Sequence, residues 1–331
     1  MKYTQLGRTG LKVSRLVLGT MNFGPQTDEA DSHAIMDAAL ASGINYFDTA
    51  NVYGWGDNKG RTEEIIGSWF DQGGGRRDKT VLATKVYGNM AGAGTDGVWP
   101  NHDRLSALNI RRAVEASLKR LRTDYIDIYQ FHHVDRRTPF EEIWQAIDVL
   151  IQQGKILYAG SSNFPGYKIA QANEKAAARG SVGLVSEQCL YNLAERRAEM
   201  EVIPAAQEYG LGVIPWSPLH GGLLGGVIKK EVEGGRRASG RAADTLADPT
   251  ARAQIQAYED LLEKHGLEPG ETALAWLLTR PGVTGPIVGP RTSDQLTSAL
   301  RAVHLDLSEE ILTALDEIFP GPGPSPEAFA W

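Results

Sequence analysis

Short apolar runs alternate along the chain with longer stretches whose apolar positions recur every three to four residues. The short runs predict β-strands and the longer ones amphipathic helices, because each period places the apolar side chains on one face. The eight predicted strands are 16–21, 45–49, 80–86, 126–132, 156–162, 184–190, 212–216 and 286–289. The predicted helices that follow them are 28–41, 61–71, 105–121, 140–153, 166–178, 198–209, 251–265 and 293–303.

Each predicted strand is followed by a predicted helix, which is the order of parallel strands joined by helical crossovers. A chain of 331 residues could form one large α/β domain or two smaller ones. Such units build either a doubly wound open sheet or a closed (β/α)8 TIM barrel, and eight units without a break in composition favour the barrel. We therefore expect an α/β barrel in which residues 1–331 form a single domain.

Three segments lie outside the eight units. Residues 1–15 alternate around a Gly-rich turn, which predicts a β-hairpin that closes the barrel floor. Residues 308–319 predict a further helix with Ser308 as its N-cap. The last segment, residues 320–331, is rich in Pro and Gly and predicts an irregular tail.

Two connections are long for a barrel of this kind. Residues 87–104 follow the third predicted strand, and residues 219–250 follow the seventh. Long loops at the carboxyl ends of barrel strands are expected to serve as lids or pocket walls. Residues 233–240 have no apolar anchors, so we expect this part to move when no ligand is bound.

Composition excludes several classes of partner. The formal net charge is −7 and has no clustered basic patch, so we expect no nucleic-acid partner. No window approaches the ~18 apolar residues of a membrane span and the N-terminus has no apolar signal core, so the expected location is the cytoplasm. Cys189 is the only cysteine and lies in an apolar run, which predicts a buried, inert thiol.

Two motifs suggest other chemistry and are set aside. Residues 92–97 match the G-x-G-x-x-G pattern of a dinucleotide-binding turn, but Pro100 forbids the helix that must start there, so we expect a flexible loop. His132, His133 and Asp135 suggest a metal site. Neighbouring residues on a strand point to opposite faces, so the two imidazoles are not expected to share an ion, and we expect no metal.

Four residues suited to proton chemistry fall at or just beyond strand ends: Asp48, Tyr53, Lys85 and His132. Singly, each has an ordinary structural explanation, such as a snorkelling lysine or a hydrogen-bonded histidine. A carboxylate on an inward strand position needs a cation, and Lys85 on the next strand supplies one. Consecutive strands are neighbours in a barrel, so we expect all four to meet at one rim.

Motifs spread over nearly the whole length carry a family resemblance. They are Gly19-Thr20-Met21, Phe47-Asp48-Thr49-Ala50, Val52-Tyr53-Gly54, Thr84-Lys85, Asp124-Tyr125-Ile126-Asp127, Ser161-Ser162-Asn163-Phe164, Gln188, Tyr191-Asn192 and Trp216-Ser217-Pro218-Leu219. With these motifs the chain resembles the aldo-keto reductase family. Its Trp-Ser-Pro-Leu version and Val288-Gly289-Pro290-Arg291 are more similar to bacterial sugar-type reductases and potassium-channel β subunits than to mammalian aldose reductases.

The resemblance implies a (β/α)8 barrel that reduces aldehydes or ketones with NADPH and without a metal. Carried over to this sequence, it makes Tyr53 the proton donor and His132 the group that orients the carbonyl. Lys85 and Asp48 would tune the tyrosine, because an ammonium beside the phenol lowers its pKa and the carboxylate keeps the ammonium charged.

The resemblance also implies a cofactor site. Ser162, Asn163 and Gln188 would bind the nicotinamide carboxamide, and Trp216 would stack on its ring, although Asn163 could instead cap a helix and Trp216 could be core. The other implied cofactor-binding residues are Gly19, Thr20, Met21, Asp48, Ser217, Leu219, Gly222, Leu224, Gly289, Arg291 and Gln295. A guanidinium can pair with a ribose 2′-phosphate, so Arg291 argues for NADPH over NADH. Many relatives have a Glu-Asn pair for the adenine amine where this chain has Ser298-Ala299.

The substrate is expected to be a small carbonyl compound. Phe23, Trp55, Tyr87 and Trp99 could form the pocket wall, which fits an aromatic carbonyl or a sugar ring equally well. Two alternatives to a general reductase therefore stay open. One is a keto-sugar reductase of deoxysugar biosynthesis, and the other is a regulatory barrel that binds NADPH and reports redox state to a partner. The sequence leaves the oligomeric state open.

Overall fold

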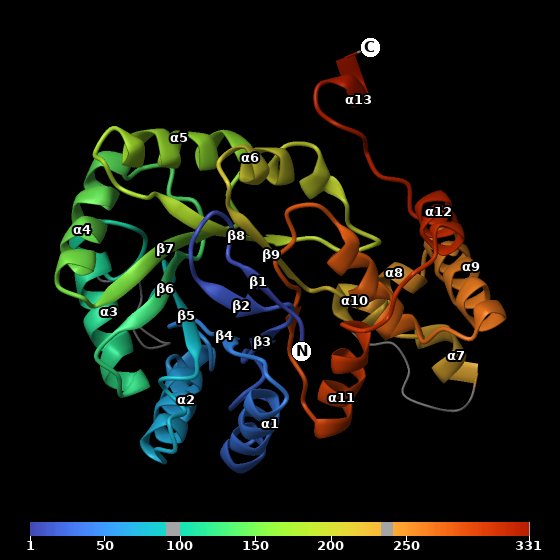
Figure 1. Ribbon diagram of the computed structural model, residues 1–331, viewed down its shortest axis with the longest axis horizontal. Coiled ribbons are helices and arrows are strands. Elements are labelled where there is room, and N and C mark those ends of the chain that lie inside the picture. The colour runs from blue at the N-terminus through green and yellow to red at the C-terminus, as the bar shows by residue number, and fades with distance from the viewer. Residues whose placement is uncertain (91–99, 233–240, 331) are drawn as a thin grey trace.

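Eight parallel strands form the centre of the protein (Figure 1). The structure is a computed structural model that describes residues 1–90, 100–232 and 241–330. The strands are β3 Val17–Gly19, β4 Tyr46–Asp48, β5 Val81–Val86, β6 Ile126–Phe131, β7 Ile156–Ser162, β8 Leu184–Leu190, β9 Gly212–Trp216 and β10 Ile287–Val288. They are hydrogen-bonded in the order β10-β3-β4-β5-β6-β7-β8-β9.

The residues just before β10 bring the two ends of this sheet together. The Val213 N–H donates to the Gly282 carbonyl at 3.0 Å, and the Thr284 N–H donates to the Val213 carbonyl at 2.9 Å. β9 and the segment that leads into β10 are therefore neighbours, and the sheet curls into a nearly closed ring. The predicted (β/α)8 barrel is confirmed.

Helices surround the ring of strands (Figure 1). Those around the barrel are α1 Glu29–Ala41, α2 Arg61–Asp71, α3 Ala107–Leu121, α4 Phe140–Gln152, α5 Gly166–Ala177, α6 Val202–Glu208, α10 Pro269–Thr279 and α11 Ser293–Ala302. The others are α7 Val227–Val232, α8 Arg241–Leu246, α9 Pro249–His265, α12 Glu309–Ile318 and α13 Glu327–Ala330, together with short 3-10 turns at Gly56–Asn58, Arg197–Glu199 and His220–Gly222.

The sequence pattern missed α10 and misjudged three segments. Residues 272–277 of α10 are all buried, so this helix has no polar face and shows no helical period. The predicted helix 198–209 is a 3-10 turn followed by α6, and residues 219–250 contain α7 and α8. The tail is not wholly irregular, because α13 lies within it. Residues 233–240, which were expected to be mobile, lie outside the described part of the chain.

The N-terminal hairpin closes one end of the barrel, as the sequence predicts. Its strands are β1 Tyr3–Gln5 and β2 Lys12–Ser14. Leu6 and Val13 are fully buried and belong to the cluster inside the barrel, whose strand members are Val17, Tyr46, Val81, Ala83, Ile128, Val185 and Ile214. The hairpin meets the chain where strands begin, because Ser14 N–H bonds the side chain of Asn45 just before β4. The hairpin does not cover the opposite end of the barrel, where the strands finish.

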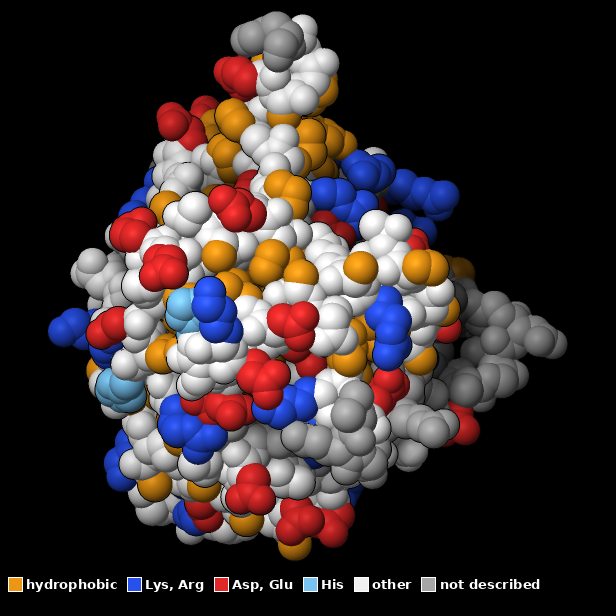
Figure 2. Space-filling view, turned by 90° about the vertical axis from the view of Figure 1, so that its right-hand side faces the viewer, with side chains coloured by type: hydrophobic (Ala, Val, Ile, Leu, Met, Phe, Trp, Pro, Cys, Tyr) orange, Lys and Arg blue, Asp and Glu red, His pale blue; other side chains and the backbone are white. Residues whose placement is uncertain are grey.

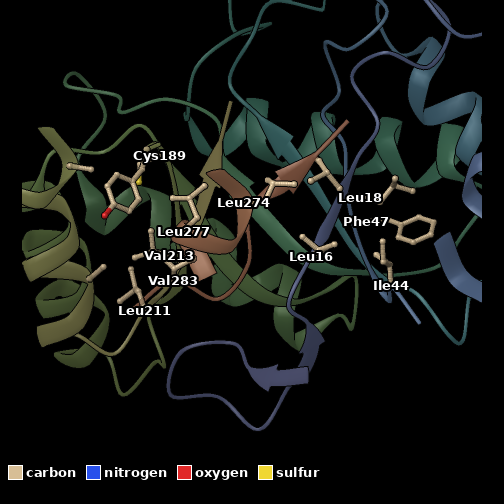
Figure 3. Packing of buried hydrophobic residues seen from close by; sticks show 14 of the residues in the cluster. Leu16, Leu18, Ile44, Phe47, Cys189, Leu211, Val213, Leu274, Leu277 and Val283 are labelled. Carbon is tan, nitrogen blue, oxygen red and sulfur yellow. The ribbon is translucent and has the colours of Figure 1, made fainter. Parts of the chain in front are cut away.

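A larger hydrophobic cluster fills the space between the barrel and the helices. Figure 3 shows part of it, with Leu211, Val213 and Val283 close to one another. Cys189 belongs to the same cluster, is 5% exposed and has a pKa raised well above its usual value by burial, then by the charge of Glu187. The predicted inert thiol therefore fits the structure.

The outer surface is mixed in charge. On the face shown in Figure 2, acidic and basic side chains alternate without a large patch of one sign. In the residues that the structure describes, no helix combines the length and apolar character that a membrane crossing requires.

Candidate active site

Asp48 and Lys85 form a buried ion pair at the carboxyl ends of β4 and β5. In the register of these strands Asp48 lies opposite Ala83, so Lys85, two residues on, points to the same inner face one step nearer the rim. The Lys85 Nζ lies 2.6 Å from the Asp48 Oδ2, and their side chains are 0% and 3% exposed. The pairing predicted from the sequence is therefore present.

Two glutamines hold the other oxygen of Asp48. The Nε2 groups of Gln130 on β6 and Gln188 on β8 donate to the Asp48 Oδ1 at 2.9 and 2.8 Å. Sequence reasoning assigned Gln188 to the nicotinamide and did not single out Gln130. The sequence did contain a signal for Gln130. It lies two residues after Ile128 on β6, so both side chains point to the same face, which is the barrel interior.

The Lys85 ammonium uses all three of its donors. Besides Asp48, it donates to the Thr49 carbonyl at 2.9 Å and to the Tyr53 Oη at 3.2 Å. Burial by itself disfavours the ammonium, but the charges of Asp48 and Tyr53 and their hydrogen bonds outweigh it, so the pKa of Lys85 is raised. Lys85 is therefore charged.

Tyr53 is presented to the rim by a turn that requires glycine. Gly54 has φ +109°, and a Cβ there would lie 1.9 Å from the carbonyl oxygen of Asn58. Burial raises the pKa of Tyr53, Lys85 lowers it in part, and Asp48 raises it again, so the net direction is upward. The expectation of a lowered pKa was wrong because the effect of burial exceeds that of the ammonium. The phenol consequently holds its proton near neutral pH.

His132 lies just past the end of β6, beside the tyrosine. The ring centroids of Tyr53 and His132 are 6.0 Å apart and the rings are nearly perpendicular. Burial, then the charges of Lys85 and His133, lower the pKa of His132 to about 2. The imidazole is therefore neutral. None of the described residues hydrogen-bonds its ring nitrogens, which leaves them available to a ligand.

The two histidines do not point to opposite faces. Their rings are stacked at a centroid distance of 4.7 Å with an angle of 2° between planes. The expectation failed because β6 ends at Phe131, so strand alternation does not extend to His132 and His133. In the described ranges, no group of three or more His, Cys, Asp or Glu is placed to hold a metal.

Asn163 joins the histidine to a tryptophan on β9. Its Nδ2 donates to the backbone carbonyl of His132 at 3.2 Å, and its Oδ1 accepts the indole N–H of Trp216 at 3.0 Å. Ser162 donates its hydroxyl to the Gln188 carbonyl at 2.9 Å. Trp216 is half-buried at the end of β9, and Asn163 does not cap α5, whose N-cap is Pro165.

The loop after β9 has an unusual backbone. Ser217 and His220 have φ of +54° and +49°, which non-glycine residues rarely adopt. The Ser217 hydroxyl accepts from the Gly221 N–H at 3.2 Å. Gly222 has open space where a side chain would be, so the loop surface there consists of backbone.

Two predicted cofactor residues of this loop differ in how deeply they are buried. Leu219 is half-buried. Leu224 has no exposed surface, and its N–H donates to the Leu219 carbonyl. Its assignment to a cofactor was wrong, because the fold directs this side chain into the core and uses its only backbone donor.

The loop after β3 lies against the loop after β10. Thr20 donates both its N–H and its hydroxyl to the Asp48 carbonyl, at 3.0 and 2.9 Å. Gly19 packs against Ile287, with no room for a side chain. Met21 is 47% exposed.

Arg291 is held beside that loop. Its N–H donates to the Gln295 Oε1 at 2.7 Å, and its guanidinium donates to the Gln26 Oε1 at 3.3 Å. The Gly289 carbonyl accepts from Asn22 at 2.8 Å. At the position where relatives carry a Glu-Asn pair, the Ser298 hydroxyl donates to Glu271 instead.

The predicted substrate wall is present only in part. Trp55 is 48% exposed with its ring 5.6 Å from that of Tyr53. Tyr87 lies edge-on to His133 at 5.2 Å. Phe23 has no exposed surface, because the turn around it directs the ring into the core, so its assignment was wrong. Trp99 and the Gly-rich motif at 92–97 lie outside the described residues.

Comparisons with known proteins agree on one family. A model of the aldo/keto reductase family matches residues 15–319. The chain is 54% identical over 333 residues to the uncharacterized oxidoreductase YrpG of Bacillus subtilis (strain 168), with 100% of both chains covered. It is 33% identical over 340 residues to versiconal hemiacetal acetate reductase of Aspergillus parasiticus, with 96% of both covered. It is also 33% identical over 331 residues to a probable voltage-gated potassium channel subunit beta of Oryza sativa subsp. japonica, again with 96% of both covered.

The family match spans both the barrel strands and the loops that carry the buried ion pair, the tyrosine and the histidine. Such breadth cannot come from one shared motif. The chain therefore belongs to the aldo/keto reductase family and is an oxidoreductase.

Proposed function

We propose that this protein reduces aldehydes or ketones to alcohols with NADPH, and that Tyr53 donates the proton. The observation that carries the proposal is the buried chain from Asp48 through Lys85 to Tyr53, which ends beside a neutral histidine. Reduction of a carbonyl delivers a hydride to carbon and a proton to oxygen. The hydrogen-bonded series of Asp48, Lys85 and Tyr53 can supply that proton.

The hydrogen-bond directions favour this role. The Tyr53 Oη accepts from Lys85, so its own hydroxyl proton remains to be donated to a carbonyl oxygen. As the phenol loses that proton, the ammonium 3.2 Å away stabilises the phenolate. The neutral His132 adds a second donor for the oxygen as it gains negative charge.

The residues around Asp48, Tyr53, Lys85 and His132 fit a nicotinamide dinucleotide. The half-buried Trp216 offers a ring for stacking, the loop 217–222 leaves open space over Gly222 where a ligand can approach the backbone, and Arg291 offers a cation. Bound NADPH would supply the hydride. Ser162, Asn163 and Gln188 would bind its nicotinamide amide, Ser217, Leu219 and Gly222 its pyrophosphate, and Gly289, Arg291 and Gln295 its adenosine end.

Arg291 supports NADPH over NADH. It can leave Gln26, a single 3.3 Å contact, to pair with a 2′-phosphate. The rings of Trp55 and Tyr87 near Tyr53 and His133 support a substrate with an aromatic or otherwise flat apolar part.

The test compares wild type with Tyr53→Phe. We expect NADPH oxidation with a panel of aromatic aldehydes, ketoaldehydes and keto-sugars for wild type, and a loss of about 10²- to 10⁴-fold for Tyr53→Phe. NADPH binding, followed by protein fluorescence quenching, should be kept. Tyr209→Phe, which changes a surface tyrosine bonded to Glu174, is the matched control and should behave as wild type.

The rate in Tyr53→Phe decides the assignment of the proton donor: a wild-type rate would refute it. Wild-type protein that binds NADPH tightly and reduces none of the panel would refute the reductase proposal. That result would favour the alternative of a regulatory barrel that binds NADPH and reports redox state to a partner. The similarity to the rice protein described as a probable potassium channel subunit supports a regulatory role.

A further inference from the structure

Glu187 is a buried carboxyl group that the proposed proton chemistry does not use. It lies on β8 next to Gln188, on the face away from Asp48, and has no exposed surface. Its Oε1 accepts the backbone N–H of Phe164 at 3.0 Å, and its Oε2 contacts the hydroxyl of Ser161. Among the described residues no Lys, Arg or His forms an ion pair with it. Burying a carboxyl group without a cation is costly, so the hydrogen bonds of Glu187 must account for its place in the core.

The partners of Glu187 belong to a strained turn at the end of β7. Asn163 in this turn has φ +58°, in the left-handed region that costs a non-glycine residue about 1–3 kcal/mol. Two hydrogen bonds to residues of β8 hold the turn, one from Asn163 and one from the residue after it. The Asn163 N–H donates to the Gln188 carbonyl at 3.0 Å, and the next N–H, of Phe164, donates to Glu187.

The left-handed turn directs the Asn163 side chain toward the end of β6 and toward β9, and its Nδ2 also donates to the Ser162 hydroxyl at 3.0 Å. Its Nδ2 bonds the His132 carbonyl, and its Oδ1 accepts from the Trp216 indole. These are the residues proposed to orient the substrate oxygen and to stack on the nicotinamide. A change in the turn would therefore shift both groups together.

We propose that Glu187 is a positioning residue that holds the Asn163 turn, and through it fixes His132 and Trp216 relative to each other. Glu187 does this as the neutral acid near neutral pH: its Oε1 accepts from the Phe164 N–H, and its Oε2 lies within hydrogen-bond distance of the Ser161 hydroxyl, which has a second acceptor in the Ser186 carbonyl at 3.4 Å. Burial raises its pKa to about 8, against the opposing hydrogen bonds from Ser161 and the Phe164 and Asn163 backbone. The effect on turnover rests on the proposed reductase function, whereas the effect on the turn does not.

The kinetic test uses two substitutions with opposite expectations. Glu187→Gln has the shape of the neutral acid and can still accept from Phe164 and donate to Ser161, so its kcat and NADPH dissociation constant should stay within about threefold of wild type. Glu187→Ala frees the turn, and kcat should fall about 10- to 100-fold as the reacting groups lose alignment. NADPH should bind more weakly, which fluorescence quenching measures without turnover.

Glu63→Gln is the matched control. Glu63 is also fully buried, but it pairs with Arg120 at 2.7 Å far from Asn163 in the chain. We expect Glu63→Gln to lose stability and to keep kcat and NADPH affinity. A fall in kcat equal to that of Glu187→Ala would show that any loss of a buried glutamate slows the enzyme, and would overturn the proposal.

A stability cycle tests the turn in the protein without ligand. Glycine adopts φ +58° without strain, so Glu187→Ala should destabilise an Asn163→Gly chain less than it destabilises wild type. Equal costs in the two backgrounds would refute the role of Glu187 in holding the turn, whatever the protein reduces. If Glu187→Ala does not fold, Ser161→Ala replaces it, since it removes one of the two contacts.

The remaining outcomes distinguish the proposed role of Glu187 from the proposed reductase function. Glu187→Ala with wild-type kcat and NADPH affinity would reduce Glu187 to a core residue. Glu187→Gln as damaging as Glu187→Ala would refute the neutral acid. Wild-type protein without reductase activity would refute only the proposed function, because the stability cycle and NADPH binding still report on the turn.

Discussion

Lys85 stabilises the folded protein because it neutralises the buried charge of Asp48. Replacing it with Met would leave Asp48 buried with only the two glutamine amides as donors. Breaking a buried ion pair from one side costs about 3–5 kcal/mol. We expect this loss for Lys85→Met in urea unfolding, and a partial recovery when Asp48→Asn is added, because the unpaired charge is then gone. Neither variant should reduce carbonyls.

The exposed Lys79 provides the control, and Lys79→Met should unfold as wild type does. Full stability of Lys85→Met would mean that Asp48 is not charged when buried, and the description of the pair would be wrong.

Glu187 also predicts a pH effect. Its pKa is about 8 in the folded protein and near 4.5 when unfolded, so the folded state holds a proton that the unfolded state has released between these values. Stability should therefore decline as pH rises from about 5 to 8 and level off above. The effect should be absent in Glu187→Gln. Cys189, the titratable neighbour of Glu187, does not contribute between pH 5 and 8, because burial and then the charge of Glu187 raise its pKa well above the usual value. Parallel pH curves for the two proteins would contradict the raised pKa.

At this scale, the sequence predicts residues whose position follows from strand order. Asp48 and Lys85 meet because inward positions of adjacent strands must meet. Phe23 and Leu224 were misassigned because the direction of a loop side chain depends on packing that no local pattern records. Gln130 was missed because an amide on an inward strand position looks like any other polar residue until its carboxylate partner is known.

Among the elements, the turn that carries Tyr53 gives the sharpest test. Gly54→Ala would place a Cβ in the Asn58 carbonyl at a backbone angle that alanine avoids, so the turn must move and Tyr53 with it. We expect kcat to fall by at least about tenfold with only a modest change in melting temperature. Gly56→Ala is the control within the same turn, because φ there is +53° but nothing lies within 4 Å of the added Cβ.

Unchanged kcat in Gly54→Ala would mean that the tyrosine position does not depend on this turn. A decrease of equal size in Gly56→Ala would assign the effect to turn flexibility in general.

Strands with short apolar runs and helices with one apolar face were predicted from the sequence, and a helix without a polar face was not. Strands β7, β8 and β9 begin and end at the predicted residues, because their apolar runs are short and sharply bounded. α10 has apolar residues on every side, since it lies between the barrel and neighbouring helices, and a periodic pattern cannot arise there.

For the molecule as a whole, we propose that the chain unfolds as one domain. Leu6 of the floor hairpin packs inside the barrel with residues from several strands, so one core links the first residues to the last strands. Leu6→Ala should cost about 2–5 kcal/mol and leave a single transition that coincides by circular dichroism and fluorescence. Because Leu6 is at the end away from Tyr53, KM for substrate and NADPH should not change. Two separate transitions would divide the chain into independent parts.

The floor hairpin also decides how the protein can be attached to a surface. β5 alone spans roughly 20 Å from the floor to the rim, and the N-terminus lies on the floor side of it. A linker fused before Met1 would therefore hold the protein on an electrode or bead with its open mouth turned to the solution. The C-terminal segment leaves from α12 beside the outer helices and offers no such orientation (Figure 1).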